Sequence, residues 1–450
     1  MATRESNEDL RRLIHEAAWT LDQFATAVNR VGAEAGASMH YDKTTVSKWL
    51  SGHKPRAPVR GFALETLSRR LGRPVTHEEA GIEPDSTAGS CTPPGQSLDT
   101  LEALINTGKA DMDPARRTVL ARSLYSAALA VPAFQDVAGR IEHQAQGRTT
   151  KIGAGEVATV RTMTARIADI LDELGGTHAR PMAAAFLVNT VAPYLRAAAP
   201  ETVRKDMLAA AADLTYLTGW MAMYERAHGL GQRYYLKALE LAGAAEDHVT
   251  YCRTLRGMAL QAANLRYANK ALELANSAAE AAPKAGPRLH AFLAGQQAHG
   301  AALVGDRRLA FARLTETEAA LSQADNRRDA VGGYDQAAYH FHVSSVLYTL
   351  RDTPGSIKAM QTSNRHRPAM ERQGRSHAHG LLAQRQLEMG HLEAACATWN
   401  SFLDDYERLS SSRADEHFYK LRRRIRPYLK NAHARQLSER AVEVARLKAA

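Results

Sequence analysis

Cysteine and aromatic residues are both scarce in this sequence of 450 residues. The three cysteines, Cys91, Cys252 and Cys396, lie far apart and form no CxxC pair. A disulfide framework and a cysteine zinc site are therefore not expected, and a reducing cytoplasm fits the chain. Phe, Trp and Tyr make up only 6% of the residues, while alanine and leucine are abundant. This composition disfavours a β-sandwich or barrel and predicts an all-α protein.

Long hydrophobic runs are absent as well. No apolar stretch approaches the roughly 18–20 residues that a membrane-spanning helix needs. The opening residues, MATRESNEDLRR, also lack the apolar segment of a secretory signal. We therefore expect a cytoplasmic protein with no membrane partner.

The motifs of common enzymes and metal sites are also missing. The sequence contains no Walker A loop, no GxSxG elbow, no HExxH motif and no GxGxxG after a predicted strand. The pairs His340/His342 and His377/His379 are two residues apart, so on a helix their side chains would diverge. These absences predict that the protein is not an enzyme and holds no cofactor and no metal.

The chain divides into three regions by composition. Residues 1–84 carry short helical patterns and a concentrated basic stretch. Residues 85–97, DSTAGSCTPPGQS, have no apolar period and predict a flexible linker. Residues 98–450 are a long series of Ala- and Leu-rich amphipathic segments, which predict a second, larger helical domain.

The larger region contains an approximate internal repeat. Short turns at Arg226, Arg266, Gly305, Arg351 and Gly390 separate its helical segments, with spacings of 40, 39, 46 and 39 residues. Helix pairs at such an interval predict an α-solenoid, in which each pair buries its apolar face by stacking on its neighbours. The small residues on these faces make the pattern similar to a degenerate tetratricopeptide repeat, whose usual period is about 34 residues. A generic helical bundle is the alternative.

The segment Asp42–Arg56, DKTTVSKWLSGHKPR, predicts a short helix with two different faces. Asp42 or Thr44 can cap its first turn, and Gly52 can end it in a left-handed conformation. The apolar side chains share one side and would face a core: Val46, Trp49 and Leu50. The other side chains would form a polar, basic surface: Lys43, Thr44, Ser47 and Lys48.

Positive charge is concentrated in and after this helix. The whole chain carries a net charge of +10, and residues 43–73 alone contain eight basic side chains against one acid, Glu65. Such local charge is expected where a protein contacts DNA phosphates, while Ser and Thr hydroxyls can reach base edges. A solvated basic helix in an all-α domain is the alternative.

The same residues carry a family resemblance. TTVSKWLSGHKPR resembles the recognition helix and following turn of XRE-type (Cro/repressor-like) helix-turn-helix regulators, whose pattern is matched by Thr45, Val46, Ser47, Lys48, Trp49 and Gly52. The longer stretch FATAVNRVGAEAG to LSRRLGRPVT resembles actinobacterial regulators that join such a domain to a tetratricopeptide-like helical region. The resemblance implies a helix-turn-helix domain at 1–84 whose second helix lies in the major groove of double-stranded DNA. It implies base or near-base contacts by Lys43, Thr44, Ser47 and Lys48, a base or phosphate contact by Thr45, and phosphate contacts by His53, Lys54 and Arg56.

The sequence departs from the family pattern at two places. Leu21 stands where related proteins have a glutamine that supports the recognition helix. Twenty positions separate Ala25 from Thr45, more than the usual tight motif has, so residues 30–41 form an insertion. This insertion predicts a longer second helix or a loop, and it offers a further groove contact through Arg30 or His40.

Two basic segments lie within the larger region. Residues 364–379, NRHRPAMERQGRSHAH, predict either a solvated surface between repeats or an anion- or peptide-binding wall on the concave face of the solenoid. Residues 406–450 contain twelve basic and five acidic side chains, which indicates a capping helix with a solvated outer face or a second DNA contact.

These patterns together predict a sequence-specific DNA-binding transcriptional regulator that acts as a homodimer. Its helical repeats would mediate dimerisation or bind a peptide, protein or small-molecule effector. The alternative is a protein-interaction scaffold whose N-terminal helical domain does not read DNA.

Overall fold

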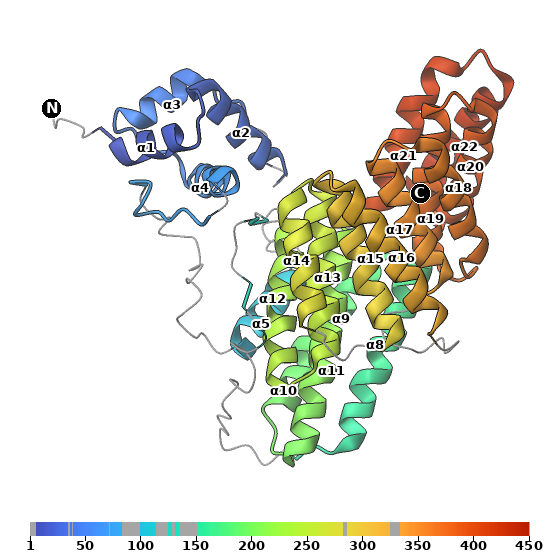
Figure 1. The fold of residues 1–450 in the computed structure, drawn as a ribbon. Helices are drawn as coiled ribbons and strands as arrows, with labels where there is room; N and C mark the ends of the chain where they lie inside the picture. The colour runs from blue at the N-terminus through green and yellow to red at the C-terminus, as the bar shows by residue number, and fades with distance from the viewer. Residues whose placement is uncertain are drawn as a thin grey trace. The chain divides into compact units, whose positions relative to one another are not determined.

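Helices form the regular structure of the described chain, and the only β-type pairing there is an isolated bridge between Lys151 and Ala198 (Figure 1). The computed structural model describes residues 6–34, 37, 39–71, 73–82, 100–113, 125–127, 131, 132, 134, 151–281, 286–324 and 334–449. The predicted all-α class is confirmed. The predicted linker, residues 85–97, lies outside the described residues. No helix in the described ranges is both long enough and apolar enough to cross a lipid bilayer.

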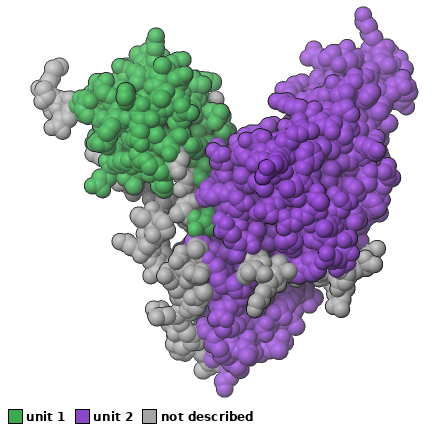
Figure 2. All heavy atoms as spheres, in the orientation of Figure 1, with its two compact units in different colours: residues 1–99, 113–131, 227–232 green, residues 100–112, 132–226, 233–450 purple. Residues whose placement is uncertain are grey.

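The chain forms two compact units, which are coloured separately in Figure 2. Unit 1 comprises residues 1–99, 113–131 and 227–232, and unit 2 comprises residues 100–112, 132–226 and 233–450. The first segment of unit 1 ends close to the predicted start of the larger domain at residue 98. Two short segments from later in the chain also belong to unit 1, and no pattern in the sequence assigned them to it.

Four helices surround a single apolar core in unit 1. They are α1 (Glu8–Glu16), α2 (Leu21–Glu34), α3 (Lys43–Leu50) and α4 (Ala57–Leu71). Each presents apolar side chains at helical spacing, and several of these are fully buried, including Leu10, Leu13, Phe24 and Leu67. Val75, Ala80 and Ile82, in the turn after α4, complete the same core.

Helices also make up the rest of the described chain, and those from α11 to α20 form an array of helix pairs (Figure 1). Apart from the first turn of α12, they belong to unit 2. Their bounds are α5 (Thr100–Met112), α8 (Ala154–Leu174), α9 (Gly176–Phe186), the π-turn η1 (Leu187–Val191), α10 (Ala192–Leu195), α11 (Glu201–Tyr224), α12 (His228–Ala244), α13 (His248–Asn264), α14 (Ala268–Glu280), α15 (Pro287–Leu303), α16 (Arg307–Ser322), α17 (Gln336–Thr349), α18 (Thr353–His366), α19 (Arg372–Glu388), α20 (Leu392–Tyr406), α21 (Ser412–Ile425), the 3-10 turn η2 (Arg426–Tyr428) and α22 (Ala432–Ala449).

Tight turns of one kind link the two helices of each pair from α11 to α20. The turn residue has a positive φ in all five pairs: 61° at Arg226, 68° at Arg266, 87° at Gly305, 70° at Arg351 and 80° at Gly390. These are the five turn positions predicted from the sequence. The helical-repeat, solenoid-like architecture is therefore confirmed, with pairs α11/α12, α13/α14, α15/α16, α17/α18 and α19/α20.

Early and late segments of unit 2 contact each other, and α8 packs against α19. Ser410 N donates to Leu174 O at 2.8 Å, and Thr177 N donates to Ser410 O at 3.2 Å. Glu225 Oε2, just after α11, accepts from the backbone N of Ser412 at 3.2 Å and from its hydroxyl at 2.9 Å. The repeat array therefore closes on itself. We call this contact the seam; it joins residues 172–177 and 225 to residues 367–372 and 410–412.

Helices α21 and α22 cover the end of the array. Their apolar faces join a core that includes Trp399 and Phe402 of α20. Part of the basic charge of residues 406–450 is used in ion pairs with neighbouring helices: Arg440 with Asp404 at 2.6 Å and Arg424 with Glu388 at 2.8 Å. This arrangement fits the capping interpretation of the C-terminal segment.

Candidate nucleic-acid interface

Helix α3 begins at a well-formed cap. The Asp42 carboxylate accepts a hydrogen bond from the backbone N of Thr45 at 2.9 Å and another from the Thr45 hydroxyl at 2.8 Å. These hydrogen bonds hold the pKa of the Asp42 carboxyl below its usual value. At the other end, Gly52 has a φ of 86°, which lets the chain leave the helix without strain. Both predicted ends of the helix are confirmed, with Asp42 as the cap.

The two predicted faces of α3 are both present. Val46, Trp49 and Leu50 are buried in the core of unit 1, at 0%, 5% and 3% exposed. The four residues expected at or near bases are exposed: Lys43, Thr44, Ser47 and Lys48. Because these positions are spaced i, i+1, i+4 and i+5, they form one continuous polar strip along the helix.

The other predicted contact residues differ in their surroundings. Those of the turn after α3 are exposed: His53, Lys54 and Arg56. Thr45 is only half-exposed, and its hydroxyl donates to the Asp42 carboxylate. Its side chain therefore supports the helix cap, which leaves only its oxygen lone pairs for a DNA contact.

The insertion gives both a longer α2 and a loop before α3. Asn29 of α2 fixes this loop: its Nδ2 donates to Tyr41 O at 2.8 Å, and its Oδ1 accepts from Tyr41 N at 2.8 Å. The Tyr41 ring then packs edge-on against Trp49, with centroids 5.4 Å apart. Asn29 and Tyr41 thus support α3 in a chain that has Leu21 in place of the expected glutamine. No local pattern marks Asn29, because its partner is twelve residues away.

Asn7 connects the far end of α3 to the rest of unit 1. Its backbone N donates to Leu50 O, the last residue of α3, at 2.9 Å. Its side-chain Oδ1 caps α1 by accepting from Leu10 N at 2.8 Å, and its Nδ2 donates to Ala80 O and Gly81 O at 3.0 Å each. The capping role has a sequence signal, since an Asn followed by Glu-Asp is typical of a helix start.

Four of the eight basic residues in 43–73 do not lie on the candidate interface. Arg60 Nε donates to Pro55 O at 2.8 Å, and Arg70 Nε donates to Ala17 O at 2.9 Å. Arg73 pairs with Glu79 at 2.7 Å. The charge count from the sequence therefore overstates the positive charge that faces solvent beside α3.

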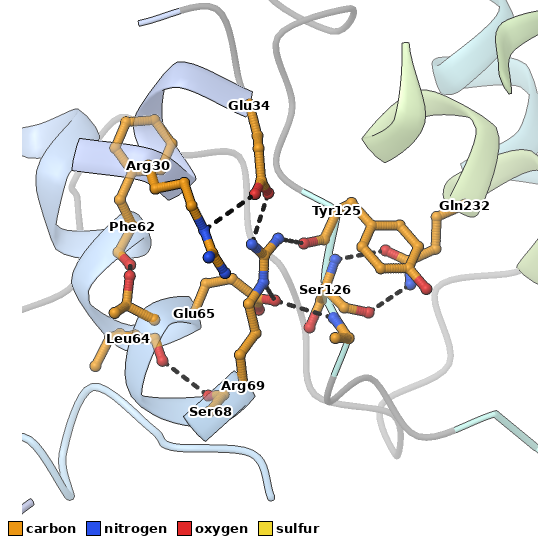
Figure 3. Close-up of polar contacts among 12 residues, drawn as sticks. Arg30, Glu34, Phe62, Leu64, Glu65, Ser68, Arg69, Tyr125, Ser126 and Gln232 are labelled. Carbon is orange, nitrogen blue, oxygen red and sulfur yellow. Dashed lines mark hydrogen bonds and ion pairs between the residues drawn. The ribbon is translucent and has the colours of Figure 1, made fainter. Parts of the chain in front are cut away.

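The fourth residue, Arg69, makes ion pairs and a hydrogen bond inside unit 1 (Figure 3). Its side chain is 7% exposed and pairs with Glu34 at 2.6 Å and Glu65 at 2.7 Å. Its Nη2 also donates to Tyr125 O at 2.8 Å. Burial raises the pKa of Glu65 while Arg69 acts to lower it, as expected for a buried ion pair. Arg69 thus ties α4 to α2 and to the segment around Tyr125, all within unit 1.

The two residues proposed for an extra groove contact are both exposed. Arg30 is paired weakly with Glu34, at 3.8 Å along the same helix, and its side chain is 73% exposed. His40 lies in the loop before α3. Neither is held in a fixed geometry toward the exposed strip of α3 by any hydrogen bond described for the loop.

Comparison with known proteins gives one similarity. Residues 10–83 match the family model described as the SP15 N-terminal domain. This span contains α2, α3 and α4 and most of α1, so it coincides with the core of unit 1 and its candidate interface. No curated protein and no solved structure matches the chain.

Proposed function

We propose that this protein is a sequence-specific, DNA-binding transcriptional regulator of the helix-turn-helix type, similar to the XRE-type regulators that its sequence resembles. The observation that carries the proposal is the strip Lys43, Thr44, Ser47 and Lys48 on a helix whose opposite side is buried. A helix of eight residues is about 12 Å long, which suits insertion of its side chains into the major groove.

The residues of the interface would have separate roles. Lysine and arginine side chains at Lys43, Lys48, Lys54 and Arg56 would contact phosphates and supply most of the affinity. Hydroxyl groups at Thr44 and Ser47 would contact base edges and supply discrimination. The support from Asn29 and Asn7 would fix the angle at which α3 enters the groove.

A single copy of α3 reads only a short half-site. We therefore propose that the protein acts in the cytoplasm as a homodimer, with the helical repeats mediating dimerisation or effector binding. A dimer predicts a two-fold symmetric DNA site whose half-sites are about 34 Å apart, one helical turn. The regulator would need no catalytic activity of its own.

The test begins with selection of bound duplexes from a random DNA library by the full-length protein. Binding of the enriched duplex is then measured by fluorescence anisotropy over a range of salt concentrations. The double variant Lys43→Ala/Lys48→Ala should bind at least tenfold more weakly at about 0.15 M salt, with a salt slope reduced by about 2. Ser47→Ala should change the preferred sequence and leave the salt slope unchanged.

The matched control is Arg11→Ala/Arg12→Ala in α1. Both arginines are exposed cations of unit 1, and each pairs within its own helix, Arg11 with Glu8 and Arg12 with Asp9. This variant should bind the duplex within threefold of the wild type (about 0.6 kcal/mol). If the lysine variant bound equally well, α3 would not be the reading helix. If the wild type enriched no sequence, the interaction-scaffold alternative would be favoured.

A further inference from the structure

A cavity of about 560 Å³ lies inside the closed array of unit 2. Its wall comes from the first helix of each successive pair, α11, α13, α15, α17 and α19, with α21 added at the seam. This volume lies within the range of about 300–1,000 Å³ found for small-molecule sites. The cavity is thus the concave inner face of the solenoid.

The described wall of the cavity carries positively charged side chains and no negatively charged ones. The described lining contains six arginines, three histidines and six aromatic side chains, and none of its residues is Asp or Glu. The six arginines are Arg256, Arg266, Arg351, Arg367, Arg385 and Arg413. They come from positions spread over more than 150 residues, so only the fold brings them together.

The buried arginines stack on aromatic rings. The Arg256 guanidinium lies 4.2 Å from the centroid of the Phe292 ring, and that of Arg413 lies 4.8 Å from the Tyr224 ring. The Arg385 guanidinium lies 4.4 Å from the Tyr348 ring, and its Nη1 donates to two serine hydroxyls, at 2.6 and 2.9 Å. These neighbours are neutral. The carboxylates that act on two of these arginines, Glu388 on Arg385 and Glu416 on Arg413, do not line the cavity.

Arg256 is a cavity arginine with an unsatisfied hydrogen-bond donor. The residue is only 7% exposed, and its Nε is buried without a hydrogen-bond partner. Burial lowers the pKa of Arg256, and the main groups that oppose this effect are tyrosines, Tyr216 and Tyr224 foremost. A buried, unpaired charge of this kind costs free energy in the folded protein, and such costs are typical of functional sites.

The pKa values of histidines in the cavity wall are lowered by burial and by nearby positive charge. Burial, with Arg256 and Arg385 nearby, lowers the pKa of His299 to about 4. Burial, with Arg256 and His299 nearby, lowers the pKa of His342 as well, and its Nδ1 lies 2.8 Å from the Tyr334 hydroxyl. The imidazoles are therefore neutral at pH 7, and the positive charge of the cavity comes from its arginines.

We propose that this cavity binds a small ligand in which a planar aromatic ring carries an anionic group. The anion would be held by Arg256 and Arg385, and the ring would pack against aromatic side chains of the wall that these guanidinium groups do not cover, such as Phe341. The anionic group is a phosphate or a carboxylate, since both suit the arginine fork. This ligand would be the effector of the proposed function. Only its role in regulation rests on that function, because binding to the cavity does not require DNA.

Binding is measured on the full-length protein by isothermal titration calorimetry, without DNA. The probes are 1-naphthyl phosphate and 2-naphthoate, with naphthalene-2-methanol as the neutral ring and inorganic phosphate as the bare anion. At least one charged aromatic probe should bind tenfold or more tightly than both the neutral ring and the bare anion. The stronger of the two charged probes identifies the anionic group. Equal binding of charged and neutral rings, or no binding of any probe, would overturn the proposal.

The variant Arg256→Met separates a binding role from a structural one. It should weaken binding of the charged probe at least tenfold while the melting temperature of the free protein stays equal or rises, because an unpaired buried charge is removed. The control Arg308→Met, at an exposed position of α16, should change neither. Retained binding in Arg256→Met, or a lower melting temperature with unchanged affinity, would contradict the assignment.

A second variant keeps the test decisive should Arg256→Met not fold. Arg266 is an exposed residue at the rim of the same cavity, so Arg266→Met removes a charge without altering the core. It should weaken binding of the charged probe about threefold and leave binding of the neutral ring unchanged. Because DNA binding is measured separately through α3, the failure of either proposal is distinguishable from the failure of the other.

Discussion

Asp42 places a negative charge at the edge of the surface that would approach DNA phosphates. Its carboxylate is exposed, caps α3 through two hydrogen bonds from Thr45 and adjoins Lys43 in the chain. A cap needs only an oxygen acceptor, and asparagine supplies one as well as aspartate does. At this residue, therefore, the charge can be removed while the helix start is preserved.

The variant Asp42→Asn should bind the selected duplex about threefold more tightly at low salt, because one repulsive charge near the phosphates is lost. The gain should shrink as salt is added. Fluorescence anisotropy at two salt concentrations measures it, with circular dichroism to show that the fold is retained. Weaker binding by a fully folded Asp42→Asn protein would mean that the start of α3 does not approach the phosphates.

The sequence predicts some residue-level features of this interface and misses others. The cap at Asp42, the glycine at position 52 and the buried side of α3 follow from local chemistry, and all are confirmed. Local chemistry does not predict which partner an arginine side chain contacts, because Arg69 and Arg73 pair with residues in other elements. Charge counting cannot distinguish a side chain that faces DNA from one that completes an ion pair.

At the scale of elements, the repeat is defined by its turns. Three of the five paired turns have an arginine at positive φ, a conformation that costs a residue with a side chain roughly 1–2 kcal/mol. The equivalent positions in the other two pairs are Gly305 and Gly390. The turns were predictable because spacing and helix endings are local signals, even where no glycine marks them.

The variant Gly305→Ala should lower the free energy of unfolding by about 1 kcal/mol. A Cβ added there meets no atom within 4 Å, so the cost comes from the φ of 87° alone. The control Gly155→Ala also adds its methyl group to open space, but within helix α8, where it should stabilise the protein by about 0.5–1 kcal/mol. Chemical denaturation measures the free energy of unfolding of both variants. A change of the same sign in the two variants would show that the turn does not constrain the backbone.

At the scale of the whole repeat unit, the seam is the feature that no sequence pattern indicated. Its hydrogen bonds join residues that are far apart in the chain, such as Glu173 and Arg372, whose Nη1 donates to Glu173 O at 2.7 Å. The central cavity depends on this closure, because its wall includes both α11 and α21. Only residues 364–379 were predicted as a possible anion-binding wall, and Arg367 and His377 from that segment do line the cavity.

The seam also contains a carboxyl group whose titration links stability to pH. Burial raises the pKa of Asp172 to about 7, Glu371 adds to the rise and Arg367 opposes it. Between about pH 4 and pH 7, therefore, Asp172 is protonated in the folded protein but ionised in the unfolded chain, where its pKa is near 3.8. Because the folded state binds more protons between these two values, stability falls as pH rises from about 4 to 7.

The variant Asp172→Asn should remove this dependence. It should be more stable than the wild type by about 4 kcal/mol at pH 8 and by less than about 1 kcal/mol at pH 4. Thermal unfolding at the two pH values measures the difference. The control Asp169→Asn changes an exposed carboxyl of the same helix and should have a small effect at both. A gain of the same size at pH 4 and pH 8 would show that Asp172 does not titrate near neutrality.

Closure also changes how the repeats can come apart. An open helical array frays from its ends, because each terminal repeat has only one neighbour and can detach alone. In this molecule the end of α8 is held by Ser410 and the start of α21 is held by Glu225, so neither helix can detach without breaking the seam as well as its contact with its neighbour in the array. Amide protons in α8 and α21 should therefore exchange with solvent nearly as slowly as those in the middle of the array, through one shared opening event.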